Sequence, residues 1–171
     1  MSDYHDSSEF YRSTANRIYA LTFLLVGEGG EDLAAEALAR ALANWSTVID
    51  TKRPEAWVRK VAVNLSISFL RRRRRERAFI EPRRVSESPS QGAEEDRLTI
   101  QQALERLSPK QRAAVVLRYY EDLSLKEMAR VMRCTTSSAD THLRRGLERL
   151  RVTLAPDYDR RSISASQAIR R

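Results

Sequence analysis

The chain has 171 residues and a formal net charge of +8, from 31 Lys and Arg against 23 Asp and Glu. This basic balance favours a nucleic-acid partner without identifying it. The one cysteine, Cys134, excludes an internal disulfide, and with only 2 histidines we expect no metal site and no other cofactor. The longest apolar run, residues 19–26, is too short to cross a bilayer, and the N-terminus is polar and acidic. We therefore expect a cytoplasmic protein without membrane insertion.

Apolar residues recur at helical spacing through the first part of the chain, and glycine and proline are scarce, with 5 of each. The first predicted helix covers residues 9–26 and ends at the glycine-rich residues 27–30. The second has an apolar stripe that extends to Trp45, which we interpret as a core residue. The opposite face of this second helix carries Asp32, Ala35, Glu36, Ala39 and Arg40.

The third predicted helix begins at Pro54 and runs into five adjacent arginines, residues 71–75. Its polar face carries Lys60, Asn64, Arg71 and Arg75, with Trp57 at the edge. Cations near a helix C-terminus stabilise it by a few tenths to ~1 kcal/mol each, and one or two arginines would satisfy that effect. The longer run favours contact with nucleic-acid phosphates, and a solvated helix end is the alternative. For Trp57, packing and DNA contact both remain open.

Helical spacing then fails over residues 78–96, where prolines, serines and glutamates predict a flexible linker. The linker separates a first domain, residues 1–77, from a second, residues 97–154. Residues 155–171 form a polar tail that we expect to be disordered, and contact with DNA or with a regulator is the alternative.

The second domain contains three predicted capping boxes, which begin at Ser108, Ser124 and Ser137. The last two open helices separated by only a few residues, the arrangement of a helix-turn-helix. The outward side of the later helix is mostly basic and carries Thr141, Arg144, Arg145, Glu148, Arg149 and Arg151. Such a face can enter a major groove, where arginine binds guanine through two hydrogen bonds. A structural three-helix unit without DNA contact is the alternative.

The predicted fold class is therefore all-α: two small helical domains joined by a flexible linker, the second a helix-turn-helix domain. In this order the parts resemble the minimal, two-domain sigma factors of the extracytoplasmic-function (ECF) group of the bacterial sigma-70 family. Residues 53–75, RPEAWVRKVAVNLSISFLRRRRR, resemble the promoter-melting segment of that family. Residues 104–132, LERLSPKQRAAVVLRYYEDLSLKEMARVM, resemble its polymerase-docking and first helix-turn-helix segments.

The resemblance implies a promoter-specificity subunit of bacterial RNA polymerase that is not an enzyme. Its implied partners are core RNA polymerase and promoter DNA, and an anti-sigma factor is left open as a third. The first domain would bind the polymerase and open the minus-ten element, and the second would recognise the minus-thirty-five element. The implied polymerase-binding residues are Asp32, Ala35, Glu36, Ala39 and Arg40. Relatives usually have a glutamine at Ala35 and a large apolar residue near Leu38 or Ala39, so fewer hydrogen-bonding groups are expected on this surface.

Two further sets of residues follow from the resemblance. The set implied for the minus-ten DNA is Lys52, Arg53, Trp57, Lys60, Asn64, Arg71, Arg72 and Arg75. Separated strands need an aromatic or apolar wall for an unstacked base, an amide for its edge and cations for phosphates. The set implied for the minus-thirty-five DNA is Lys126, Arg133, Ser138, Asp140, Thr141, Arg144, Arg145 and Arg149.

The turn between the last two helices departs from the family pattern. A glycine is common in relatives where this chain has Arg133, so we expect a positive φ at Arg133. Asp140 stands at a position that is usually basic, either as part of a capping box or as an acceptor for a cytosine amine. We interpret Cys134 as a small core residue of the turn, with a redox sensor as the alternative.

The nearest competing function is a stand-alone helix-turn-helix repressor whose first domain dimerises or senses a signal. Such a protein would bind duplex DNA by itself, as a dimer on a palindrome. The sequence contains no glycine-rich phosphate loop, no metal-ligand spacing and no histidine placed near a nucleophile, which argues against an enzyme.

Overall fold

The computed structural model describes residues 2–79 and 100–168, and every regular element in these ranges is a helix. The predicted all-α fold is therefore confirmed. The predicted linker, residues 78–96, lies almost wholly outside the described residues.

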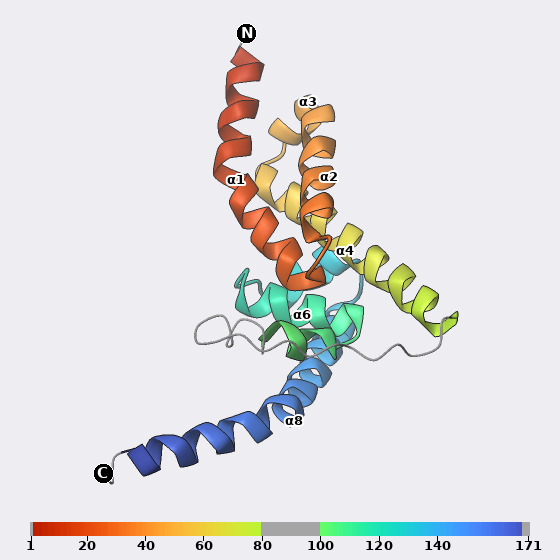
Figure 1. Ribbon diagram of the computed structural model, residues 1–171. Helices are drawn as coiled ribbons and strands as arrows, with labels where there is room; N and C mark the ends of the chain where they lie inside the picture. Colours follow the sequence, from red (N-terminus) through yellow and green to blue (C-terminus); the bar gives the residue numbers. More distant parts are fainter. Residues whose placement is uncertain (1, 80–99, 169–171) are drawn as a thin grey trace.

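Two long helices and a tight turn form the start of the first half. α1 (Ser2–Val26) and α2 (Gly30–Ala43) lie side by side and run in opposite directions (Figure 1). The turn between them needs glycine, because Gly27 and Gly29 have φ of 73° and 87°. At Gly30 the backbones are so close that a Cβ would lie 2.9 Å from the Thr22 carbonyl oxygen.

α4 (Pro54–Phe79) crosses both helices and completes the first core. Leu21 and Leu25 of α1, Leu38 of α2 and Val58 of α4 are all fully buried within it. The segment between α2 and α4, which the sequence predicts as a plain connection, contains the short α3 (Trp45–Ile49). Trp45 is buried at the start of α3, as predicted for a core residue.

The second half contains a short helical segment over residues 100–105, followed by α6 (Pro109–Tyr119), α7 (Leu125–Met132) and α8 (Thr136–Ala168). The capping boxes predicted at Ser108 and Ser124 are confirmed. Each serine hydroxyl accepts a hydrogen bond from the backbone N–H of the residue three positions later, and the side chain of that residue accepts a hydrogen bond from the serine N–H. α8 packs closely on α6 at Gly146, where a Cβ would lie 2.9 Å from Val115 Cγ2.

The third predicted capping box is wrong. The N-cap of α8 is Thr135, whose hydroxyl accepts from the backbone N–H of Ser138 at 3.1 Å, so Ser137 lies inside the helix. The preceding turn is short because Arg133 adopts the predicted positive φ, 51°, and the N–H of Cys134 returns to the carbonyl of Ala129. Helix α8 therefore begins earlier than predicted, and Asp140 is not a capping residue.

Two helices are longer than predicted. α1 begins at Ser2 rather than near residue 9. α8 continues to Ala168, through most of the tail over residues 155–171 that we predicted to be disordered. Continuing a helix pairs backbone groups that would otherwise have no partner in the chain, and apart from Pro156 the added residues tolerate helical conformation.

The two halves pack directly against each other. α1 and α4 contact α6, and α4 also contacts α7 (Figure 1). The buried Arg112 of α6 donates from Nη1 to the carbonyl of Leu25 in α1, at 2.8 Å. Although the sequence predicts two separately folded domains, the structure shows them in one closed arrangement with polar bonds across the contact.

Candidate polymerase and nucleic-acid interfaces

The outer face of α2 is available for a partner protein. Asp32, Ala35, Glu36, Ala39 and Arg40 are all exposed, because the buried stripe of α2 lies on its other side. Glu36 and Arg40 form an ion pair one turn apart. The five residues predicted from the sequence therefore share one open helix face.

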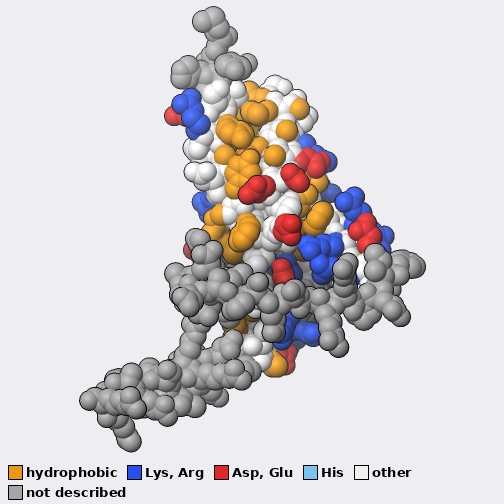
Figure 2. Space-filling model, in the orientation of Figure 1, with side chains coloured by type: hydrophobic (Ala, Val, Ile, Leu, Met, Phe, Trp, Pro, Cys, Tyr) orange, Lys and Arg blue, Asp and Glu red, His pale blue; other side chains and the backbone are white. Residues whose placement is uncertain are grey.

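Large apolar side chains are exposed near this helix. Phe23 of α1 is 53% exposed, and Leu42 and Ile49 are also exposed. Figure 2 shows hydrophobic side chains gathered over α1 and α2, with acidic side chains beside them. An exposed apolar patch with polar groups at its rim is typical of a protein-binding surface.

The start of α4 and the segment before it carry the first group predicted to contact DNA. Lys52, Arg53 and Lys60 are exposed, whereas Trp57 is half-buried and packs against the core. Arg53 Nη1 lies 3.8 Å from a carboxylate oxygen of Glu127 in α7. The pKa of the Glu127 carboxyl is lowered, first by its hydrogen bonds to Ser124 and also by the nearby Arg53.

Asn64 is half-buried where α4 meets α7. Its side-chain amide donates to the carbonyl of Lys60 at 2.6 Å and to the carbonyl of Val131 at 2.9 Å. The second bond joins residues 67 positions apart, one in each half. In the closed arrangement the amide predicted to bind a base edge is therefore occupied by the backbone of α7.

The arginine run stays largely available at the end of α4. Arg71, Arg72, Arg74 and Arg75 are exposed, while Arg73 is half-buried. Arg72 pairs with Glu76 at 3.6 Å and lies 5.9 Å from the centre of the Phe69 ring. Exposed pairs of this kind contribute at most about 1 kcal/mol, so they leave the run free to meet phosphates.

The helix-turn-helix also presents a basic surface. Lys126 of α7, Arg133 of the turn, and Asp140, Arg144, Arg145 and Arg149 of α8 are exposed, whereas Ser138 and Thr141 are half-buried. Ser138 is held by Thr135, which donates its hydroxyl hydrogen to the Ser138 hydroxyl at 2.8 Å. His142 is half-buried, and its pKa is lowered by burial and then by Lys110, Arg145 and Arg71. The helix surface thus combines exposed arginines with a histidine whose charged form is disfavoured.

Glu121 is a residue that sequence reasoning missed. It is only 5% exposed, and its carboxylate accepts a hydrogen bond from Arg17 Nε of α1 at 3.1 Å. Arg59 Nε of α4 lies 3.0 Å from the other oxygen, as an ion contact without hydrogen-bond geometry. The bond to Glu121 raises the pKa of Arg17. Nothing in the local sequence YYEDLS distinguishes this glutamate from a solvent-exposed turn residue.

The described residues show neither a membrane helix nor a metal site. None of their helices is both long enough and apolar enough to cross a membrane. Across residues 2–79 and 100–168, no three His, Cys, Asp or Glu side chains lie close enough together to hold a metal ion.

Comparison with known proteins connects both halves to one family. The family model for sigma-70 region 2 matches residues 10–76, and the model for sigma-70 region 4 matches residues 97–150. The chain is 35% identical over 141 residues to the RNA polymerase sigma-E factor of Streptomyces coelicolor, a match that covers 80% of this chain and 78% of that protein. It is 27% identical over 156 residues to the ECF RNA polymerase sigma factor SigW of Bacillus subtilis, covering 81% of this chain and 83% of that one.

A solved structure has a similar fold. The sigma factor RpoE of Bartonella quintana, crystallised in complex with the anti-sigma factor NepR, superposes with a TM-score of 0.71. The match covers 88% of this chain and 97% of that chain at 23% sequence identity. At this level of identity the similarity establishes the fold alone.

Proposed function

The chain belongs to the ECF group of the sigma-70 family, the promoter-specificity subunits of bacterial RNA polymerase, and we propose that its two halves recognise separate promoter elements. The observation that carries this proposal is the order of the two matched regions, each of which contains a helix with exposed arginines. On this proposal the first half, residues 1–77, binds the polymerase and opens the minus-ten element. The second half, residues 97–154, binds the minus-thirty-five element.

The polymerase would dock on the open face of α2. Asp32 and Glu36 supply charge there, while Ala35 and Ala39 leave a flat surface between them. The neighbouring exposed Phe23 and the apolar patch of Figure 2 add area that a partner can bury. We infer that this contact depends on shape and apolar area more than on hydrogen bonds, because two of its five residues are alanines.

Opening of the minus-ten element would use the start of α4. Trp57 supplies an aromatic wall and Asn64 an amide for the edge of an unstacked base, while Lys52, Arg53 and Lys60 supply charge for phosphates. Each stacked base contributes roughly 1–3 kcal/mol in the single-stranded state, which offsets the lost duplex stacking. The exposed arginines at the end of α4, Arg71, Arg72 and Arg75, would bind phosphates of the adjoining duplex.

The minus-thirty-five element would be read by α8, with support from the turn before it. Arg144, Arg145 and Arg149 are the candidates for guanine or phosphate contacts, and Asp140 for a cytosine amine, since it caps no helix. Lys126, Arg133, Ser138 and Thr141 flank them. Because the Asp140 carboxylate is negatively charged like the phosphates, it would not increase the overall affinity for DNA. It would act on sequence preference instead.

Promoter binding would require the closed arrangement to open. Asn64 is bonded to Val131, and Arg53 lies beside Glu127, so two of the residues proposed for the minus-ten element face the second half. The polymerase would hold the two halves apart on DNA elements that lie separate from one another. An anti-sigma factor, the kind of partner solved with RpoE of Bartonella quintana, would be able to hold them together.

In vitro transcription with purified core polymerase on a library of promoter variants tests the function. We expect specific initiation that depends on both elements, with the protein acting in the cytoplasm as a non-catalytic subunit. Gel filtration should show a complex with core polymerase. Binding of a palindromic duplex as a dimer, with no effect on polymerase, would contradict the proposal and identify a repressor.

A further inference from the structure

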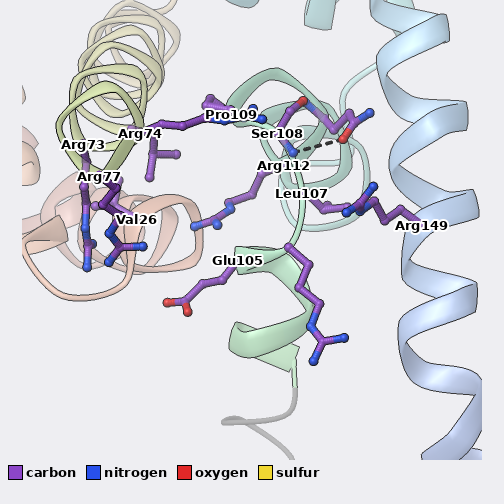
Figure 3. Close-up of a pocket in the computed structure, with 13 residues that line it drawn as sticks. Val26, Arg73, Arg74, Arg77, Glu105, Leu107, Ser108, Pro109, Arg112 and Arg149 are labelled. Atoms are coloured by element: carbon purple, nitrogen blue, oxygen red, sulfur yellow. Dashed lines mark hydrogen bonds between the residues drawn. The ribbon is translucent and has the colours of Figure 1, made fainter. Parts of the chain in front are cut away.

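A strongly cationic cavity lies where the two halves meet. It has a volume of about 460 Å³ and is bounded by the last turns of α4, by Val26 of α1, by residues 105–109 with Gln111 and Arg112, and by α8 (Figure 3). Both halves therefore contribute to its walls. Six of its lining side chains are arginines, namely Arg73, Arg74, Arg77, Arg106, Arg112 and Arg149.

Among the described residues, little negative charge balances the arginines of this cavity. Glu105 is the one acidic side chain among its described lining residues. No ion pair joins any of the six arginines to a carboxylate in the part of the chain that the structure describes. Gathering like charges at one site disfavours the closed arrangement, so an anion bound there would be stabilising.

Among the six arginines, Arg112 is the clearest indication that the cavity binds an anion. Arg112 is only 4% exposed. Its Nη1 donates a hydrogen bond to the carbonyl of Leu25, whereas its Nε has no partner among the described groups. Burial lowers the pKa of Arg112 to about 10, with Glu105 opposing and Arg73 adding to that effect. A buried guanidinium is costly unless it is paired with a negative charge, so an anion bound in the cavity beside Arg112 would lower that cost.

We propose that this cavity binds a small anion with two or more phosphate groups, such as a nucleoside oligophosphate. The planar fork of arginine matches phosphate oxygens with two parallel hydrogen bonds, and several arginines together favour several phosphates. The volume is that of a small-molecule site and is far too narrow for a DNA duplex. Val26, Leu70 and Leu107 line another part of the cavity and provide an apolar wall for a base or sugar.

Such a ligand would couple to the arrangement of the halves. Arg73 and Arg77 belong to α4, whereas Arg112 belongs to α6, so the complete site exists only while the halves are packed together. A ligand that binds one arrangement shifts the population toward it. The anion therefore favours the closed protein, in which Asn64 is occupied.

Calorimetric titration of the full chain with sodium tripolyphosphate, in 0.15 M salt, tests the site. The double variant Arg73→Gln/Arg77→Gln removes two lining arginines, and Arg71→Gln/Arg75→Gln removes two arginines of the same run that do not line the cavity. We expect the first to weaken binding by about tenfold or more and the second by less than about threefold, since direct phosphate bonds outweigh screened charge. Circular dichroism verifies that both variants are folded.

Two further titrations distinguish a nucleotide from DNA as the phosphate-bearing ligand of the cavity. A short DNA duplex should lose more affinity in Arg71→Gln/Arg75→Gln than in Arg73→Gln/Arg77→Gln, because Arg71 and Arg75 are exposed and do not line the cavity. ATP and GTP, like tripolyphosphate, should lose more affinity in Arg73→Gln/Arg77→Gln than in Arg71→Gln/Arg75→Gln. Tighter binding of ATP or GTP than of tripolyphosphate would show that the apolar wall contacts the nucleoside. Absence of tripolyphosphate binding, or equal losses in the two double variants, would overturn the proposal.

Discussion

The side-chain amide of Asn64 donates a hydrogen bond to the backbone carbonyl of Val131, which links α4 to α7, the first helix of the helix-turn-helix. One amide hydrogen cannot serve the α7 backbone and a DNA base at the same time. With the role proposed for Asn64, the closed arrangement and promoter opening would compete for the same group.

Replacing Asn64 by alanine should abolish promoter opening while leaving polymerase binding intact. The variant loses the amide proposed for the flipped base, and it also loses one bond across the halves that contributes about 1 kcal/mol. Permanganate reactivity of unpaired thymines measures opening, and gel filtration measures polymerase binding. Ser68→Ala, at an exposed position one turn further along α4, is the matched control. Loss of polymerase binding in Asn64→Ala would show that Asn64 acts in folding instead.

Replacing Glu121 by glutamine should loosen the closed arrangement. Arg59 would keep a largely buried guanidinium without its carboxylate, whereas Arg17, with 59% of its side chain exposed, would be hydrated. We expect the free energy of unfolding to fall by roughly 2 kcal/mol, which is less than the usual cost of breaking a fully buried ion pair. Small-angle scattering should report a larger radius of gyration than for the parent chain. The exposed Glu148→Gln should change neither radius nor stability, and an unchanged radius in Glu121→Gln would contradict the assignment.

Stability should fall as the pH drops from about 7.5 to 5.5, in part through His142. The folded pKa of His142 lies below its ordinary value because of burial and nearby cations. The unfolded chain then binds the proton more readily, so the stabilising contribution is complete above the unfolded pKa and is lost as the pH falls below it. Urea unfolding at the two pH values measures the loss, and His142→Gln should reduce it. Glu127 also has a lowered pKa, but its contribution is lost in a more acidic range.

Replacing Arg133 by glycine should stabilise the fold by roughly 0.5–1 kcal/mol. Arg133 has a φ of 51°, where a side chain is strained and glycine is not. Thermal unfolding measures the gain. Arg130→Gly, in the interior of α7, should destabilise by about 1 kcal/mol because glycine there only adds flexibility. A loss of stability in both variants would mean that the Arg133 side chain makes an important contact.

Local sequence patterns were sufficient to predict most of the helices. The confirmed capping boxes at Ser108 and Ser124 depend on residues three positions apart, and the buried stripe of α2 on steps of three and four residues. The cap of α8 was mispredicted because Thr135, Thr136, Ser137 and Ser138 can each cap a helix. The backbone path through Arg133 selects among them, and no composition rule encodes that path.

By itself the sequence determined the helical class, the order of the two halves, and which helices carry the arginines, because periodicity and charge are properties of neighbouring residues. The tertiary structure alone decided that the halves pack together. It buried Glu121 between Arg17 and Arg59, gave Asn64 its distant acceptor, and enclosed arginines of both halves around one cavity. Those relationships join residues far apart in the chain, and their energies arise from burial and desolvation that exist only after the halves have met.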